Sequence, residues 1–294
     1  MPQAAIELSA VDKSFRRGEP VLRGINLRIE RGEMVALIGA SGSGKSTMIR
    51  SVAGLVPIDQ GAGRIAIDGT TMQANGRIEG SAKAIRARVG VIFQQFNLVP
   101  RLPVLTNVCL GCLGRIPAWR GTLGRFSKLE MQQAMQALMR VGIADQALKR
   151  GSELSGGQQQ RAAIARTLVQ GAEILIADEP IASLDPSAAR RVMDILTALN
   201  REDGITVLVS LHQVEYALNF CPRTIALRKG EVVYDGPSNA LTPQFLAELY
   251  GAESEQLFVP GLEAVPALSP KANGHASRQG NSSGFGVSAI AAAG

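Results

Sequence analysis

The sequence predicts an α/β fold built on a mainly parallel sheet, to which an antiparallel β subdomain and a helical subdomain are attached. An apolar run at Met34–Ile38 leads into a glycine-rich turn and then into a helical pattern, the order strand, turn, helix. Short apolar runs at residues 174–177 and 207–211 are typical of strands that a parallel sheet buries on both faces. Residues 4–35 alternate apolar and polar side chains in places, which favours antiparallel strands.

The remaining segments complete this outline. Residues 60–72 are typical of a further hairpin in the antiparallel subdomain. Residues 96–153 are mostly helical in pattern, and an amphipathic helix, whose methionines we interpret as core residues, ends at Gly142. We therefore expect one domain over residues 4–250, with its helical subdomain at about 96–160. The tail at 255–294 is rich in Pro, Gly, Ala and Ser, which predicts disorder.

The glycine-rich turn fits the phosphate-binding pattern GxxxxGK[ST]. Gly42 and Gly44 lack a Cβ, so the backbone can curl and direct its N–H groups at phosphate oxygens. Lys45 brings a positive charge to the β- and γ-phosphates, and the Ser46 hydroxyl can hold Mg²⁺. The alternative is a flexible Gly/Ser loop without a ligand. On that interpretation the lysine, the hydroxyl, the strand before the turn and the helix after it would occur together only by coincidence. The predicted nucleotide site comprises Gly39, Ala40, Ser41, Gly42, Ser43, Gly44, Lys45, Ser46 and Thr47.

A second glycine-containing turn lies at residues 154–158, which read Leu-Ser-Gly-Gly-Gln and lead into a helix. Ser155 is a residue type that caps helix N-termini, and Gly156 and Gly157 leave backbone N–H groups open to an anion. By itself the segment reads only as a turn before a helix. Its position shortly before the apolar run at 174–177 indicates a functional role.

Two carboxylates follow that apolar run directly. Asp178 and Glu179 stand where a buried strand ends, a position from which one can hold Mg²⁺ and the other can polarise a water molecule. We predict Asp178 as the metal ligand and Glu179 as the group that acts on the attacking water. A solvated loop is the plain alternative, which the preceding phosphate loop and strand disfavour.

Taken together and in this order, the motifs resemble those of the ATP-binding cassette (ABC) ATPases, P-loop NTPases, over about residues 4–250. The resemblance implies that ATP and Mg²⁺ are the cofactors and that residues 155–158, including Gln158, contact the nucleotide. Four further roles rest on the resemblance alone. They are an adenine-stacking ring at Phe15, a metal-binding and catalytic glutamine at Gln94 with Gln95 as the competing candidate, a D-loop aspartate at Asp185 and a catalytic switch histidine at His212.

Without the resemblance, two of these residues have plainer interpretations. His212 could be a histidine whose hydrogen bonds are satisfied at the end of a strand, and Phe15 could be an ordinary core or hairpin residue.

The cysteines also have a plain interpretation. Cys109 and Cys112 have CxxC spacing, but no second pair or nearby histidine completes a zinc site, so we interpret them as small apolar side chains on a helix.

Composition limits the possible partners. The 294 residues are 46% hydrophobic and 19% charged, which suits a folded chain, and no apolar stretch approaches the length of a membrane span. The N-terminus lacks a secretory pattern, so we expect a cytosolic protein. The net charge is +6, yet the basic residues are spread along the chain without a block of interleaved aromatics. We therefore expect no nucleic-acid partner and favour a basic surface near anionic lipid headgroups.

One branch of the family fits best. Residues 114–127, which include Trp119, resemble the phosphonate-import ATPases, as do Ile181 and Gln213 where many importer ATPases carry Thr and Asp. The alternatives are an ATPase for another importer, for phosphate, amino acids or a similar small solute, or a non-transport ABC ATPase. The segment at 114–127 could also be a loop packed on the helical subdomain, with Trp119 as its anchor.

The resemblance implies a two-subunit cycle at the cytoplasmic face of the inner membrane. ATP held by residues 39–47 of one copy is covered by residues 155–157 of a second, head-to-tail copy. Glu179 and His212 act on the water and the γ-phosphate. Hydrolysis loosens the homodimer, and the motion reaches the transmembrane permease subunits. A periplasmic phosphonate-binding protein would be an indirect partner. A DNA- or ribosome-directed cassette would carry a coiled-coil insertion or a second cassette, and a non-catalytic scaffold would have lost Lys45 or Glu179.

Overall fold

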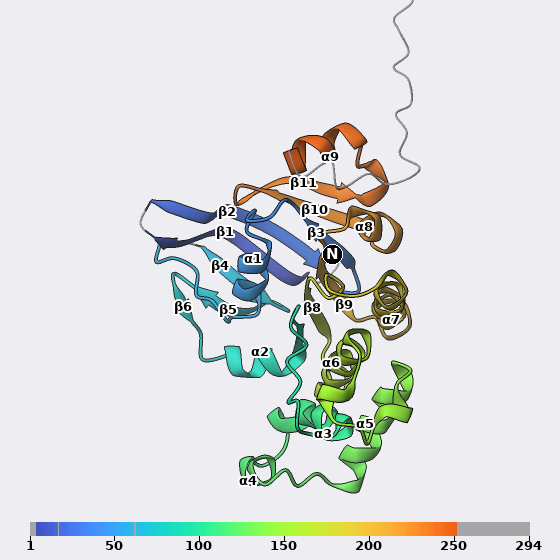
Figure 1. Ribbon diagram of the computed structural model, residues 1–294. Helices are drawn as coiled ribbons and strands as arrows, with labels where there is room; N and C mark the ends of the chain where they lie inside the picture. Colours follow the sequence, from blue (N-terminus) through green and yellow to red (C-terminus); the bar gives the residue numbers. More distant parts are fainter. Residues whose placement is uncertain (1–3, 17, 62, 252–294) are drawn as a thin grey trace, which may run out of the picture.

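The computed structural model describes residues 4–16, 18–61 and 63–251, so the tail expected at 255–294 lies outside the described residues. The larger sheet has the strand order β11-β10-β3-β9-β8-β7, with parallel pairing throughout except between β10 and β11 (Figure 1). The mainly parallel core is therefore confirmed. Its strands are β3 (Met34–Ile38), β7 (Val89–Ile92), β8 (Ile174–Asp178), β9 (Thr206–Ser210), β10 (Arg223–Arg228) and β11 (Glu231–Pro237).

The strands of this sheet are buried on both faces, which explains their continuous apolar runs. All five residues of β3 are buried. Because side chains alternate along a strand, Val35 and Leu37 pack into one apolar cluster and Met34, Ala36 and Ile38 into the other. The first cluster joins the sheet to the antiparallel subdomain, and the second joins it to the covering helices.

The smaller sheet is antiparallel, as the alternation near the N-terminus predicts. Its strand order is β2-β1-β4-β5-β6. The strands are β1 (Ala4–Arg16), β2 (Glu19–Glu30), β4 (Arg64–Ile67), β5 (Thr70–Ala74) and β6 (Arg77–Ile78). Helix α1 (Lys45–Val52) packs Met48 and Ile49 into the apolar cluster that the two sheets share. This contact fixes the antiparallel subdomain beside the glycine-rich turn.

Short helices form the end of the molecule away from the antiparallel sheet (Figure 1). Helix α6 packs against α3 and α5, so the expected subdomain boundary near residue 160 falls inside a continuous helix. The helical elements are α2 (Ala82–Arg88), α3 (Val104–Cys109), η1 (Leu110–Gly114), α4 (Ala118–Thr122), α5 (Lys128–Arg140), η2 (Ala144–Gln146), η3 (Gly151–Glu153), α6 (Gly156–Gln170), α7 (Pro186–Asp203), α8 (Val214–Phe220), η4 (Ser238–Ala240) and α9 (Pro243–Tyr250). None of the described helices is long and apolar enough to cross a membrane.

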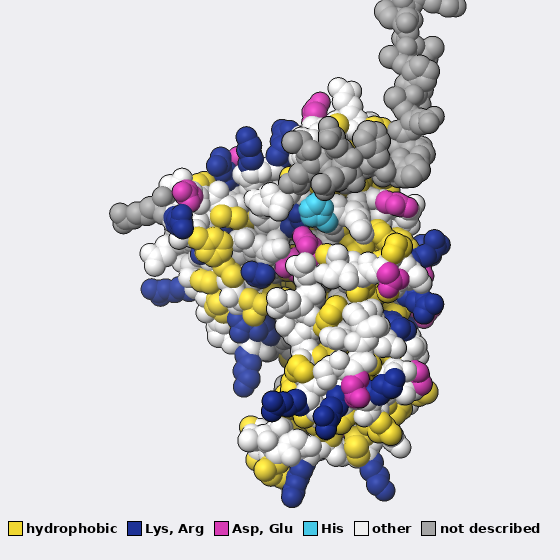
Figure 2. Space-filling view, viewed as in Figure 1, with side chains coloured by type: hydrophobic (Ala, Val, Ile, Leu, Met, Phe, Trp, Pro, Cys, Tyr) yellow, Lys and Arg dark blue, Asp and Glu magenta, His cyan; other side chains and the backbone are white. Residues whose placement is uncertain are grey.

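Helix α5 corrects one expectation. Its buried stripe consists of Ala134, Ala137 and Leu138, whereas Met131 and Met139 are exposed, so the interpretation of its methionines as core residues is wrong for these two. The spacing of three and four residues selects the alanines and the leucine for the core. Met131 and Met139 fall outside that stripe, whereas Met135 is partly buried against the core cluster. Figure 2 shows hydrophobic side chains at the surface of this helical end.

The three cysteines are free and buried, as expected of small apolar side chains. Cys109 and Cys112 lie in the cluster that the helices share with the sheet. Burial raises the pKa of Cys109 to about 11 and that of Cys221 to about 12. These thiols therefore stay protonated and unreactive at neutral pH.

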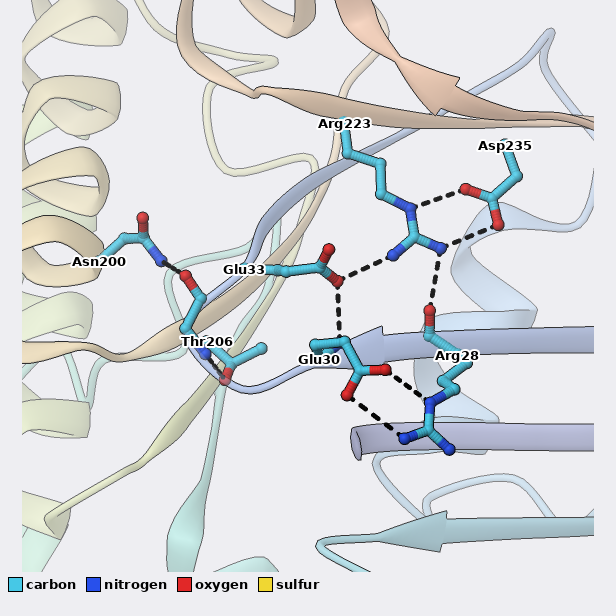
Figure 3. Close-up of polar contacts among 8 residues, drawn as sticks. Arg28, Glu30, Glu33, Asn200, Thr206, Arg223 and Asp235 are labelled. Atoms are coloured by element: carbon cyan, nitrogen blue, oxygen red, sulfur yellow. Dashed lines mark hydrogen bonds and ion pairs between the residues drawn. The ribbon is translucent and has the colours of Figure 1, made fainter. Parts of the chain in front are cut away.

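A polar network ties the turn between β2 and β3 to its neighbours (Figure 3). The Arg223 guanidinium donates to both carboxylate oxygens of Asp235 (2.7 and 2.9 Å) and to Glu33 (2.8 Å). On the other side, Gly32 N–H donates to the Thr206 hydroxyl (3.0 Å), and the Asn200 amide donates to the Gly32 carbonyl (2.8 Å). The turn between β2 and β3 is thus hydrogen-bonded to β9, β10 and α7. It lies at the end of the sheet opposite the glycine-rich turn.

Candidate nucleotide site

The glycine-rich turn runs between the end of β3 and the start of α1, and two of its residues must be glycine. Gly39 has φ 147° and Gly44 has φ 107°, conformations that side chains with a Cβ rarely adopt. A Cβ at Gly39 would also lie 2.2 Å from the Leu227 carbonyl oxygen, and one at Gly44 would lie 2.8 Å from that of Val21. The neighbouring backbone therefore fixes the curl of the turn.

The start of α1 and the Ser43 hydroxyl have features that an anion site requires. No side chain caps the N-terminus of α1, and its first turn has no acidic residue, so its backbone N–H groups and the positive end of its dipole face the turn. Ser43 is only 6% exposed, and its hydroxyl has no hydrogen-bond partner among the described residues. A bound phosphate would satisfy both features, so the residues present fit a nucleotide.

Lys45 lies inside this curl. Its side chain is 5% exposed, and its ammonium donates to the carbonyl oxygens of Gly39 (2.6 Å) and Ala40 (3.2 Å). Burying an ammonium is costly unless it is hydrogen-bonded, and these carbonyls provide that compensation. The charge is therefore positioned within reach of a phosphate in the turn.

The predicted metal ligands lie together. The Ser46 hydroxyl donates to Asp178 Oδ1 (3.0 Å), and the same carboxylate oxygen accepts from the Ser210 hydroxyl (3.1 Å). Asp178 is 4% exposed and stands at the carboxyl end of β8. A hydroxyl and a carboxylate are hard oxygen ligands of the kind Mg²⁺ prefers, with phosphate and water completing its coordination. No larger cluster of His, Cys, Asp and Glu suited to a metal occurs within the described part of the chain.

The two residues predicted to act on water share a pocket. Glu179, Ser210 and His212 line a hollow of about 270 Å³ at the ends of β8 and β9. Glu179 has φ 49°, an uncommon left-handed conformation for a residue with a side chain, and its N–H donates to the Ser210 hydroxyl (2.9 Å). Ser210 thus fixes both Asp178 and the backbone of Glu179. Its only signal in the sequence was its place near the end of an apolar run.

Phe15 and Gln94 lie at the surface. The Phe15 ring is 64% exposed, and the Lys13 ammonium lies 5.3 Å from its centre. Phe15 is therefore not a core residue, and its ring is available for stacking. Gln94 and Gln95 are both exposed and follow Phe93, one residue beyond the end of β7, so the choice of Gln94 stays a prediction.

Residues 155–158 form a separate cluster at the start of α6. Ser155 caps this helix by accepting from Gln158 N–H (3.3 Å), while the Gln158 side chain accepts from Ser155 N–H (2.9 Å). A Cβ at Gly156 would lie 3.3 Å from Leu184 and 3.4 Å from Phe96. The turn is therefore packed between the segment after β7 and the segment before α7.

Asp185 caps α7, which gives this residue a local structural role. Its carboxylate accepts from Ala188 N–H (2.9 Å), and Pro186 occupies the first helical position. Ala188 in turn lies close to residues 155–158, because a Cβ added at Gly157 would lie 2.7 Å from the Ala188 Cβ. The nucleotide-binding roles of Asp185 and of residues 155–158 stay predictions.

Tyr250 is a residue of the site that sequence reasoning missed. It lies in α9, more than two hundred positions from the turn, yet its hydroxyl accepts a hydrogen bond from Gly39 N–H (3.3 Å). Its ring is 3% exposed and lies 6.3 Å from the His212 ring, tilted by 48°. No local pattern marks this tyrosine, since only the fold brings α9 to the phosphate loop.

Fold and site together define a P-loop protein whose carboxylates, histidine and phosphate loop meet at the ends of parallel strands. The family model described as ABC transporter matches residues 22–182. Two relatives are named phosphonates import ATP-binding protein PhnC. The one from Cupriavidus pinatubonensis is 54% identical over 266 residues, covering 90% of this chain and 95% of that protein. The one from Stutzerimonas stutzeri is 58% identical over 251 residues, covering 85% and 91%.

Solved structures agree. The dimeric bacterial ABC transporter cassette MJ0796 is 35% identical, with a TM-score of 0.69 and coverage of 80% of this chain and 100% of that chain. Its post-hydrolysis state, bound to ADP and Pi, has a TM-score of 0.67, 35% identity and the same coverage. The chain belongs to the ABC transporter family, and it is an ATP-binding, ATP-hydrolysing subunit of that family.

Proposed function

We propose that this chain is the energy-coupling ATPase of a bacterial importer that takes up phosphonates. The observation that carries the proposal is sequence identity of 54–58% over most of the chain to proteins named for phosphonates import. The intact site supports the enzymatic half, since Lys45, Asp178, Glu179 and His212 are all present and positioned.

The first half of the mechanism belongs to one subunit. Lys45 and the backbone N–H groups of residues 39–47 bind the phosphates and stabilise the charge that develops on the γ-phosphoryl group. Ser46 and Asp178, joined by Gln94, would hold Mg²⁺, which neutralises phosphate charge when bound. Glu179 would orient and polarise the attacking water, and His212, which lines the same hollow, would contact the γ-phosphate.

The second half requires another copy of the chain. Ser155 and the N–H groups of Gly156 and Gly157 lie at the N-terminus of α6, where the helix dipole favours an anion. We place them over the ATP of a head-to-tail partner. Phe96 and Leu184 pack against Gly156, so movement of the segment after β7 would reach this turn directly.

The same segment is the proposed route to the permease subunits. The ATPase would sit at the cytoplasmic face of the inner membrane, and a periplasmic binding protein would deliver the phosphonate to the permease. The phosphonate never touches this chain. Ile181 is buried and Gln213 is exposed beside His212, so both residues reflect lineage and local fit and are not ligand contacts.

Gene deletion tests the substrate. A strain without this subunit should fail to grow on a phosphonate as sole phosphorus source while growing normally on phosphate. The wild-type gene should restore growth, and a Glu179→Gln gene should not. Normal growth of the deletion strain on several phosphonates, in a cell without a second such system, would show that the importer carries another solute.

A further inference from the structure

The positive charge of the chain is concentrated in one segment. Residues 80–129 contain eight Lys and Arg residues and no Asp or Glu. The whole chain carries +6, so the other residues together carry −2. Basic residues are spread along the sequence, but acidic ones are absent from these fifty consecutive positions. The basic residues are Lys83, Arg86, Arg88, Arg101, Arg115, Arg120, Arg125 and Lys128.

The fold gathers part of this charge around one hollow. Lys83 and Arg86 from α2, Arg115 after η1 and Arg166 from α6 line a surface pocket of about 370 Å³. Among the described residues that line it, none is acidic. Arg86, Arg115 and Arg166 each donate to a backbone carbonyl, of Gly54, Val169 and Asn97 respectively, which orients their guanidinium groups. Lys83, Arg86 and Arg115 are exposed, and Arg166 is partly buried.

Exposed apolar side chains occupy the same segment. Leu113, Trp119, Leu123 and Leu129 are 42%, 59%, 62% and 63% exposed. Trp119 therefore does not anchor its loop in the helical subdomain. Figure 2 shows hydrophobic and basic side chains side by side at the end of the molecule where α4 and α5 lie.

Helix α4 presents this surface in a fixed orientation. Arg120 is paired with Glu130 at 2.6 Å, and both side chains are partly buried. Glu130 also accepts from Ser127 N–H (2.6 Å) and completes the cap of α5. These contacts hold Arg120 inward, and its neighbour Trp119 points away from the core. We name residues 113–129, together with the basic pocket beside them, the basic tip.

We propose that the basic tip binds anionic phospholipid headgroups, with Trp119 at the membrane–water interface. This inference rests on the proposed function, which places the subunit at the membrane. Trp and Leu flanked by Arg and Lys are the composition of a membrane-interface surface. Cations in α2, in the segment after η1 and around the N-terminus of α5 match a fluid layer of negative charges, whereas a folded partner would need a paired set of carboxylates.

Vesicle binding tests the proposal with the full chain. We expect it to co-sediment with vesicles that contain phosphatidylglycerol, to bind pure phosphatidylcholine vesicles far less, and to be released by salt. Trp119 is the only tryptophan of the chain, so its fluorescence should shift to shorter wavelength on binding. Arg125→Ser/Lys128→Ser should weaken binding by on the order of tenfold. Trp119→Ser should also weaken it.

A matched control tests whether vesicle binding depends on the basic tip or only on the net positive charge of the chain. Arg23→Ser/Arg201→Ser removes the same charge from β2 and α7 and should leave vesicle binding unchanged. All variants should hydrolyse ATP at the parent rate, so failure here is distinct from failure of the proposed function. Equal loss in both double variants, or no preference for phosphatidylglycerol, would overturn the proposal. So would a Trp119 shift produced by the purified permease but not by vesicles, since the tip would then dock on protein.

Discussion

The Tyr250 hydroxyl accepts a hydrogen bond from the Gly39 N–H, at 3.3 Å, and so joins α9 to the first residue of the phosphate loop. The same ring lies 6.3 Å from the His212 ring. The buried Tyr250 side chain therefore contacts the phosphate loop and also lies near His212, the histidine that is predicted to act on the γ-phosphate.

Replacing Tyr250 by Phe should separate these two contacts. The substitution removes the hydroxyl and keeps the ring, so Gly39 loses a partner while the packing beside His212 remains. A neutral hydrogen bond contributes about 1 kcal/mol, so we expect KM for ATP to rise by about three- to tenfold with a smaller change in kcat. Tyr250→Leu removes the ring as well and should also lower kcat. Steady-state kinetics measure both, and a uniform loss of folded protein would instead indicate a structural role only.

Lys45→Ala and Glu179→Gln should abolish turnover for different reasons. The first removes a charged hydrogen-bond donor to phosphate and should weaken ATP binding by on the order of tenfold or more. The second keeps the phosphate cradle and removes the group that orients water, so ATP should bind while turnover falls by at least about a hundredfold. Nucleotide-binding titration together with phosphate release distinguishes them. Parental turnover in Glu179→Gln would disprove the assignment of this carboxylate.

The composite site can be tested by mixing subunits. If Ser155 acts on ATP held by the Lys45 of a partner, a Lys45→Ala chain and a Ser155→Arg chain should together form a dimer with one complete site of two. Size-exclusion chromatography with ATP should then show association that neither variant shows alone. Absence of any ATP-dependent association in the mixture would contradict the head-to-tail arrangement.

The buried cysteines predict a loss of stability in alkali. Burial raises the pKa of Cys109 from 9.0 to about 11, and that of Cys221 from 9.0 to about 12. Both thiols stay protonated in the folded state while the unfolded chain ionises, so the unfolded state binds fewer protons above pH 9. The free energy of unfolding should therefore fall as pH rises from about 9 toward 11. Denaturant titrations of the parent and of Cys109→Ala/Cys221→Ala should show a shallower fall in the variant.

Local sequence patterns specify the elements that carry the chemistry. The run at 34–38 is β3 without change, the run at 174–177 is one residue shorter than β8, and the run at 207–211 is shifted by one residue from β9. These elements can be recognised in the sequence for two reasons. A strand that is buried on both faces needs a continuous apolar run, and a curled phosphate loop needs glycine at fixed positions. Both constraints act over a few neighbouring residues.

Contacts between distant segments depend on the tertiary structure. It made Ser210 the hydroxyl that holds Asp178 and Glu179, and it brought Tyr250 to Gly39. It also exposed Trp119, which the sequence allowed as an anchor. A serine near the end of an apolar run and a tyrosine in an amphipathic helix have no local signature, because their roles depend on which strand ends and helices meet. That meeting is set by the pairing order of the sheet and by the packing of α9, α4 and α5 upon it.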